Sequence, residues 1–178
     1  TDAMANLVVG NALTPGAHIG AVVDERQLKQ NLDYIEIAKS EGAELVVGGE
    51  RLSLQTEGFF MSPALFINTN NQMQINREEV FGPIACVIKV DNYEQALEVS
   101  NDSDFGLTSG IITESLKFAS HFKRNSKSGC VMVNLPTAGT DYHVPCGSRK
   151  ASSYGPREQG QYARDFYTII KTNYSKPY

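Results

Sequence analysis

The sequence predicts an α/β fold with a parallel sheet flanked by helices. Three apolar runs, at residues 84–90, 109–112 and 130–134, alternate with two segments of helical periodicity. Strands that alternate with helices in this way are joined by right-handed crossovers and pair in parallel. The composition is that of a folded domain, because 41% of the 178 residues are hydrophobic and 20% are charged, so general disorder is excluded and one folded unit is expected.

The clearest predicted helix begins after Asp24. Asp24 is placed to cap the helix, Gln27 to complete a capping box, and Gly42 to end it. Its apolar residues recur at helical spacing and so define one buried face, formed by Leu28, Leu32 and Ile35.

Short strands are expected next. Residues 43–47 form an apolar strand, and a polar loop is expected after Gly48-Gly49. Residues 59–61 and 64–67 are expected to form a strand pair interrupted by Pro63, which is typical of an edge or an irregular segment.

Two further helices are predicted in the second half of the chain. Asp91, with Glu94 as its capping-box partner, starts the first of them. Either Thr113 or Ser115 caps the second, which precedes the strand 130–134.

Beyond this strand the pattern changes. Residues 135–148 form a long loop without periodicity, and loops of that length in a compact domain are usually functional. Residues 165–174 alternate and are rich in β-branched and aromatic residues, so a strand is expected there. Because it lies at the end of the chain, we expect it to pair with another chain.

The turn at residues 77–83 is the most informative loop. Gly82 and Pro83 favour a stiff corner before the strand 84–90, which holds Glu79 and Phe81 at a strand end. A carboxylate there can accept hydrogen bonds from a vicinal diol such as a ribose, and a phenyl ring can pack on a flat heterocycle. The alternative is a surface turn whose glutamates face solvent.

Several classes of function are disfavoured by composition. The net charge of -4 argues against nucleic-acid binding, and no apolar stretch is long enough to cross a bilayer. No secretory signal opens the sequence, so a cytoplasmic location is expected. The three cysteines form no Cys-x-x-Cys pair, which argues against a zinc site, and Cys86 and Cys130 are interpreted as inert core thiols. His18 and His121 are interpreted as loop and surface residues, and no complete catalytic set is present.

An ordered set of motifs resembles the NAD(P)-dependent aldehyde dehydrogenases. These motifs run through most of the chain and include Glu78-Glu79-Val80-Phe81-Gly82-Pro83, Phe105-Gly106-Leu107, Pro145-Cys146-Gly147 and Thr168-Ile169-Ile170-Lys171. The segment 152–160 is similar to the branch that contains α-ketoglutarate semialdehyde (2,5-dioxopentanoate) dehydrogenases.

The resemblance implies roles for particular residues. Glu79 matches the glutamate that binds the ribose hydroxyls of the nicotinamide half of NAD or NADP, Phe81 matches the aromatic residue beside it, and Leu107 matches an apolar contact near the nicotinamide. The substrate is expected to be a small-molecule aldehyde, oxidised to a carboxylic acid. Its pocket is implied to be closed by the loop that holds Leu135, His143 and Cys146.

The resemblance also divides the chain. Residues 1–164 match part of the catalytic domain, and residues 165–178 match the C-terminal strand of the arm through which the family forms homo-oligomers. The family's nucleophilic cysteine, general base and dinucleotide-binding fold are expected to precede Thr1, so no catalytic residue is assigned here and the chain alone is expected to be inactive. The alternative is a non-catalytic relic or binding module; a free-standing nucleotide-binding domain is disfavoured because no Gly-x-Gly-x-x-Gly motif is present.

Three positions depart from the family pattern. Cys146 and Ser148 stand where Phe and Gly are usual, and Ala151 stands where Gly is common. The smaller Cys146 side chain is expected to widen the aldehyde pocket and to alter its specificity.

Overall fold

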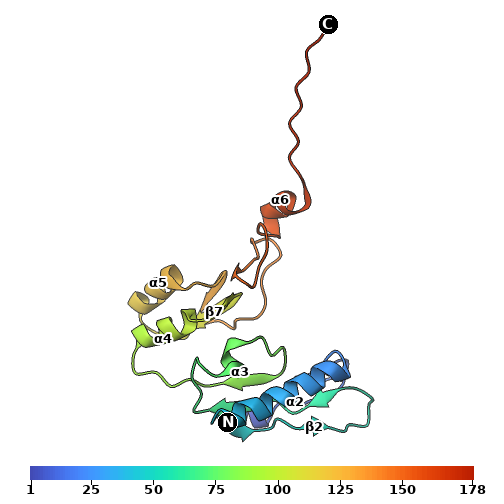
Figure 1. Cartoon of the computed structure of the whole chain (residues 1–178), viewed down its shortest axis with the longest axis vertical. Helices are drawn as coiled ribbons and strands as arrows, with labels where there is room; N and C mark the ends of the chain where they lie inside the picture. Colours follow the sequence, from blue (N-terminus) through green and yellow to red (C-terminus); the bar gives the residue numbers. More distant parts are fainter. The chain divides into compact units, whose positions relative to one another are not determined.

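The computed structural model describes residues 1–178 (Figure 1). The chain forms two compact units, Thr1–Val90 and Asp91–Tyr178, where its length alone predicts one. The first unit contains α1 (Asp2–Ala5), α2 (Glu25–Ser40), β1 (Glu44–Val47), β2 (Arg51–Leu52), β3 (Phe60–Met61), β4 (Ala64–Ile67), α3 (Gln74–Arg77) and β5 (Ile84–Cys86). The second contains α4 (Tyr93–Asn101), β6 (Phe105–Gly106), β7 (Thr108–Ile111), α5 (Leu116–Asn125), β8 (Cys130–Val133), β9 (Arg149–Lys150), the 3-10 helix η1 (Gly160–Tyr162) and α6 (Ala163–Tyr167). None of these helices has the length and hydropathy that a membrane span requires.

The sheet of the first unit has the order β1-β4-β5, with β4 parallel to β5 and antiparallel to β1. The predicted pairing of residues 59–61 with 64–67 is wrong. β3 pairs with β2 instead, so residues 60–67 form one side of a bent antiparallel ribbon and residues 44–52 form the other. The ribbon bends where Gly48 lies against the carbonyl of Pro63, an approach that leaves no room for a side chain.

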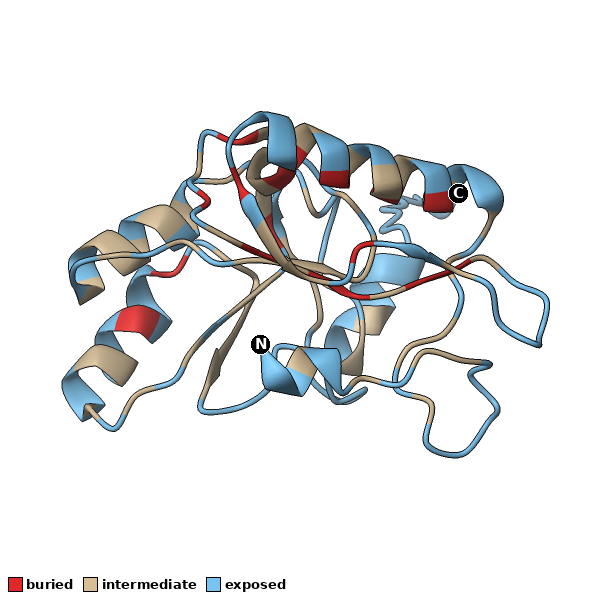
Figure 2. Cartoon of the chain, turned by 90° about the horizontal axis from the view of Figure 1, so that it is seen from below, coloured by how far each residue is buried: buried red, intermediate tan, exposed pale blue.

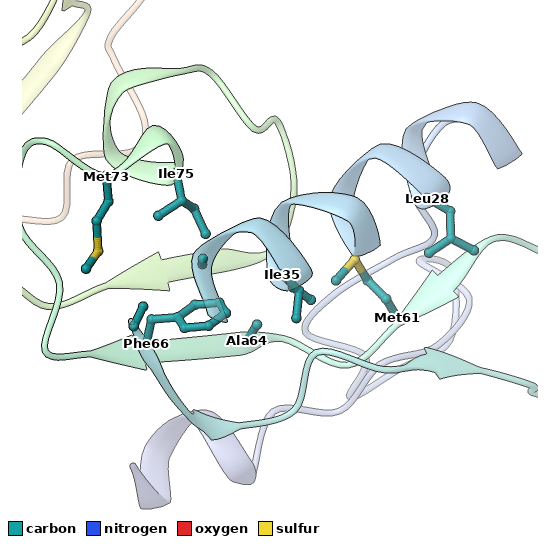
Figure 3. Close-up of a cluster of buried hydrophobic side chains, with 9 residues drawn as sticks. Leu28, Ile35, Met61, Ala64, Phe66, Met73 and Ile75 are labelled. Carbon is teal, nitrogen blue, oxygen red and sulfur yellow. The ribbon is translucent and has the colours of Figure 1, made fainter. Parts of the chain in front are cut away.

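Helix α2 covers this sheet with one face. Its buried residues recur every three or four positions, at Leu28, Asn31, Ile35 and Ala38. They pack against Met61, Ala64 and Phe66 of the strands and against Met73 and Ile75 around α3 (Figure 3). In Figure 2 the buried residues are concentrated where α2 meets the strands. Asp24 caps α2 as predicted, because its carboxylate accepts the N–H of Gln27 at 2.7 Å.

The Gln27 side chain does not complete a capping box. Its amide turns inward and donates to Oδ1 of Asn31 at 2.8 Å and to the carbonyl of Val80 at 3.0 Å. A tertiary acceptor therefore takes the hydrogen bond that the local pattern assigns to the helix start. Gly82 lies against the same place, since a Cβ added there would be 2.4 Å from Nδ2 of Asn31.

A second contact ties α2 to the same part of the chain. The Tyr34 hydroxyl donates to Oε2 of Glu78, which also accepts from Nε2 of Gln74 at 3.0 Å. The hydrogen bond from Tyr34, followed by that from Gln74, lowers the pKa of Glu78. The same hydrogen bond raises the pKa of Tyr34, because the phenol must keep its proton to donate.

The parallel sheet predicted from the runs 84–90, 109–112 and 130–134 is confirmed only in part. The first run forms the shorter strand β5 and pairs with β4 in the sheet of the first unit, not with the other two runs. Strand β7 pairs in parallel with β8, and α5 lies between them in the sequence. Ser115 is the residue that caps α5. The cap of α4 is Asn92, with Gln95 as its partner, so the predicted pair Asp91 and Glu94 is wrong by one residue.

The end of the chain differs from the strand predicted at 165–174. Residues Ala163–Tyr167 form α6, which closes when the Thr168 hydroxyl donates to the Arg164 carbonyl at 2.6 Å. The helical residues correct the first part of the predicted strand. From Thr168 to Tyr178 the chain has neither helix nor strand, because a strand needs a backbone partner and this chain supplies none there.

We expect Gly82→Ala to destabilise the first unit by about 1 to 3 kcal/mol, because the added methyl group must displace the buried Asn31 amide. Urea unfolding followed by circular dichroism measures the change. Gly10→Ala is the matched control, since the nearest atom to its added Cβ is at an ordinary 3.8 Å. Equal stability of the Gly82→Ala and Gly10→Ala variants would contradict the close approach.

The Tyr34 and Glu78 pair predicts a pH window for stability. The lowered pKa of Glu78 contributes stability above the ordinary glutamate pKa, which is lost as the pH falls through the folded value. The raised pKa of Tyr34 contributes stability below the ordinary tyrosine pKa, which is lost as the pH rises through the folded value. Tyr34→Phe should therefore lower the urea midpoint in neutral solution and much less in acid or strong alkali. A difference that is constant with pH would refute this assignment.

Candidate functional site

The turn from Glu78 to Pro83, here called the Glu79 corner, contains residues that contact helix α2 and residues that do not. Glu78, Val80 and Gly82 are the residues that contact α2. Glu79 and Phe81 alternate with them and are exposed. Residues that contact α2 thus alternate along the turn with residues that do not.

The corner is also fixed at its far end. The carbonyl of Pro83 accepts the N–H of Ala64 at 2.9 Å, at the start of the parallel pairing of β4 with β5. Ile84 donates its N–H back to the carbonyl of Gly82 at 2.8 Å. The backbone on both sides of Glu79 and Phe81 is therefore anchored in the core of the first unit.

Phe81 has a φ of +57°, in the left-handed region that non-glycine residues rarely adopt. Such a conformation costs on the order of 1 kcal/mol and persists where the surroundings over-determine it. The structure requires glycine at position 82 for space and places the positive φ on Phe81. The Phe81 ring is 73% exposed.

The chemistry of the corner follows from this geometry. The Glu79 carboxylate is exposed and has no hydrogen bond or ion pair in the chain, so all its acceptor positions are available. An aromatic face two residues away offers apolar area beside it. The binding of a vicinal diol by Glu79 and of a flat ring by Phe81 stays a prediction.

The sequence analysis missed the three residues that hold the corner, Gln27, Asn31 and Tyr34. They are spaced four and three residues apart and so form a polar line beside the apolar residues Leu28, Leu32 and Ile35. That line was the available signal, and a polar line on a buried helix face indicates specific hydrogen bonds.

Leu107 belongs to the second unit, in the link between β6 and β7. Its side chain is 53% exposed, while its carbonyl accepts the N–H of Cys130 at 3.0 Å. It borders an open hollow of about 240 Å³ that is also lined by Phe105, Ser109 and Ser128.

The predicted pocket residues also lie in the second unit. Leu135 is 63% exposed, His143 is exposed, and Cys146 is half-buried. Cys146 and Glu158 exchange two backbone hydrogen bonds, of 2.8 and 3.0 Å, which tie the long loop to the segment before η1. No hydrogen bond or ring contact joins the three side chains to one another.

The remaining cysteine and histidine side chains have structural surroundings. Burial raises the pKa of the Cys86 thiol to about 11, which keeps it protonated and unreactive, as predicted. Nδ1 of His18 accepts the N–H of Val8 at 3.0 Å, and His121 meets the Tyr93 hydroxyl at 2.8 Å. No group of three or more His, Cys, Asp or Glu side chains is arranged to hold a metal ion.

Comparison with known proteins agrees with the motifs. Residues 1–173 match the aldehyde dehydrogenase family. Alpha-ketoglutaric semialdehyde dehydrogenase of Bacillus subtilis is 40% identical over 174 residues, which cover 97% of this chain and 36% of that protein. Alpha-ketoglutarate semialdehyde dehydrogenase of Haloferax volcanii is 42% identical over 160 residues, which cover 88% of this chain and 33% of that protein.

Solved structures give the same result for the fold. An indole-3-acetaldehyde dehydrogenase variant from P. syringae, solved with NAD+ and IAA, superposes with a TM-score of 0.88 at 36% identity, over 96% of this chain and 34% of that one. The present chain thus spans about a third of the length of the curated relatives that it matches. The α/β fold and the resemblance predicted from the motifs are confirmed, and the chain belongs to the aldehyde dehydrogenase family.

Proposed function

We propose that this chain supplies the nicotinamide-ribose contact and the aldehyde-pocket loop of an NAD(P)-dependent aldehyde dehydrogenase that oxidises an aldehyde to a carboxylic acid. The observation that carries the proposal is the Glu79 corner, where an unpartnered carboxylate and an exposed ring stand on an anchored backbone. The P. syringae relative was solved with NAD+, which supports a dinucleotide as the ligand.

The residues of the corner fit this ligand. The ionised Glu79 accepts hydrogen bonds only, so it suits the two hydroxyl donors of a ribose, and such charge-assisted bonds are the stronger kind. Phe81 provides a flat apolar surface for the adjoining part of the cofactor. Leu107 is assigned an apolar contact with the nicotinamide. The bound nicotinamide would supply the hydride acceptor, and the residues of this chain would orient it.

The aldehyde that we propose is α-ketoglutarate semialdehyde. Two relatives at 40% and 42% identity carry that substrate in their names. Leu135, His143 and Cys146 are assigned to the pocket on the loop that the Cys146 and Glu158 backbone pair ties down. Cys146 in place of the usual aromatic residue would leave more room in the pocket than the family pattern does.

We assign no catalytic residue in this chain. None of the three cysteines stands in the family's nucleophile motif, and the buried Cys86 thiol remains protonated at neutral pH. Chemistry would then need the nucleophile, general base and dinucleotide-binding fold of the family. The assignment of residues 1–164 to part of the catalytic domain, and the cytoplasmic location, stay predictions.

We also propose that residues 165–178 contact a second copy of the protein. Between Thr168 and Tyr178 the apolar residues Ile169, Ile170 and Tyr174 are exposed and the backbone has no partner in the chain. The same segment favours a second candidate function, that of a non-catalytic oligomerisation or binding module derived from the family. Such a module would need no active site.

Glu79→Gln should weaken NAD+ binding by about tenfold or more, because a charge-assisted hydrogen bond to the ribose becomes a neutral one. Isothermal titration calorimetry of the complete gene product gives the dissociation constant of NAD+. ADP, which lacks the nicotinamide riboside, should bind unchanged. Glu57→Gln removes another exposed glutamate of the first unit and is the control. Unchanged NAD+ affinity in the Glu79→Gln variant would remove the corner from the cofactor site.

Purified residues 1–178 should not reduce NAD+ or NADP+ when an aldehyde is added. The measurement is the absorbance of the reduced nicotinamide with α-ketoglutarate semialdehyde and with a simple aliphatic aldehyde. A rate above that of the mixture without protein, abolished by thiol alkylation, would show that this chain contains its own nucleophile.

A further inference from the structure

Asn31 is a polar residue in a place where an apolar one would be expected. It lies between Leu28 and Ile35 on the core face of α2 and is fully buried, with 0% of its surface exposed. A buried amide is unfavourable unless its polar atoms are satisfied. Its contacts therefore indicate why the fold keeps it, and all of them lead toward the Glu79 corner or the strand beneath it.

The first contact orients Gln27. Nε2 of Gln27 has two N–H groups, and the structure pairs one with Oδ1 of Asn31 at 2.8 Å and the other with the carbonyl of Val80 at 3.0 Å. Because the amide is planar, fixing one N–H sets the direction of the other. Asn31 thus aims the hydrogen bond that holds the backbone of Val80.

The second contact sets the position of Gly82. The amide of Asn31 occupies the space where a Cβ of Gly82 would be, with Nδ2, Cγ and Oδ1 all between 2.4 and 2.7 Å of that point. Nδ2 of the same amide also donates to Sδ of Met61 on the strand, at 3.6 Å. The side chain therefore fills the space between β3 and the corner.

These two contacts bracket Phe81, the residue with the positive φ. A strained residue keeps its conformation only while its neighbours are held, and here the neighbours are Val80 and Gly82. Release of either would let the backbone relax and would redirect the Phe81 ring and the Glu79 carboxylate together.

We infer that Asn31 is a positioning residue for cofactor binding, which acts through Gln27 and Gly82 to aim Glu79 and Phe81 at the nicotinamide riboside. The inference rests on the proposed function of the Glu79 corner. Asn31 itself touches no ligand, since it is fully buried beneath the turn. Its role is to hold the backbone from which the two ligand-facing side chains project.

Two variants of the complete gene product test the inference. Asn31→Leu keeps the number of side-chain heavy atoms and the branch at Cγ, and removes the acceptor of Gln27. Gln27→Met removes both N–H donors at a half-buried site, so it leaves the core intact and decides the question if Asn31→Leu does not fold. Ile35→Val, a buried change on the same face of α2 away from the corner, is the matched control.

Titration calorimetry with NAD+ and with ADP provides a readout that a general loss of stability would not produce. Asn31→Leu and Gln27→Met should each weaken NAD+ binding by about five- to tenfold and leave ADP binding within about twofold. The double variant should bind NAD+ about as weakly as the worse single variant, because Asn31→Leu already removes the orientation of the Gln27 hydrogen bond to Val80. Ile35→Val should lower the melting temperature and leave both ligands unaffected.

The Glu79→Gln variant distinguishes the possible failures. If Glu79→Gln weakens NAD+ binding and Gln27→Met does not, the positioning role is overturned while the corner remains the cofactor site. Equal weakening of NAD+ and ADP by Asn31→Leu and Gln27→Met also overturns it, since the effect would then be general. If Glu79→Gln binds NAD+ normally, the proposed function of the corner fails first.

Discussion

The close approach of Gly82 to the buried amide of Asn31 is the contact on which the rest of the first unit depends. It brings the turn before β5 onto helix α2, which itself packs on β3 and β4. Because the contact leaves no space for a side chain, the distance between helix and turn is determined by steric exclusion as well as by hydrogen bonds. The parallel pairing of β4 with β5 begins immediately after this contact.

The same arrangement separates the residues of a single turn that hold the fold from the two that we propose to bind a ligand. The carboxylate of Glu78 and the backbone carbonyl of Val80 accept hydrogen bonds from α2. Glu79 and Phe81 are exposed and contribute little to the packing of the unit. An exposed aromatic ring at a positive φ is unfavourable for folding alone. A feature of that kind, on an otherwise well-anchored segment, is typical of a residue retained for recognition.

The sequence predicted local features well. The start of α2 at Asp24 and the pairing of β7 with β8 follow from caps and apolar runs of adequate length. Pairing between strands that are distant in sequence could not be predicted in the same way. Strands β2 and β9 are two residues long, which is too short to show an alternation of apolar and polar residues. Gln27 shows why such contacts could not be predicted. Its side chain could form either a capping box or a hydrogen bond to Val80, and the choice depends on the tertiary fold. Glu79 and Phe81 were proposed as site residues from the Gly-Pro turn, but the contacts of Gln27 and Asn31 with this turn could not be predicted in that way.

The hydrogen bond between Ala64 and Pro83 affects the rates at which a ligand could bind and dissociate. The hydrogen bond of 2.9 Å places the end of the corner at the first residue pair of a parallel ladder. Opening the corner as a hinge would therefore require breaking the edge of the sheet, which is a sub-global event and a rare one. A nicotinamide riboside held here would leave by breaking its own contacts with the protein, without a prior opening of the corner. Its residence time would then report the strength of the contacts rather than the frequency of a protein motion.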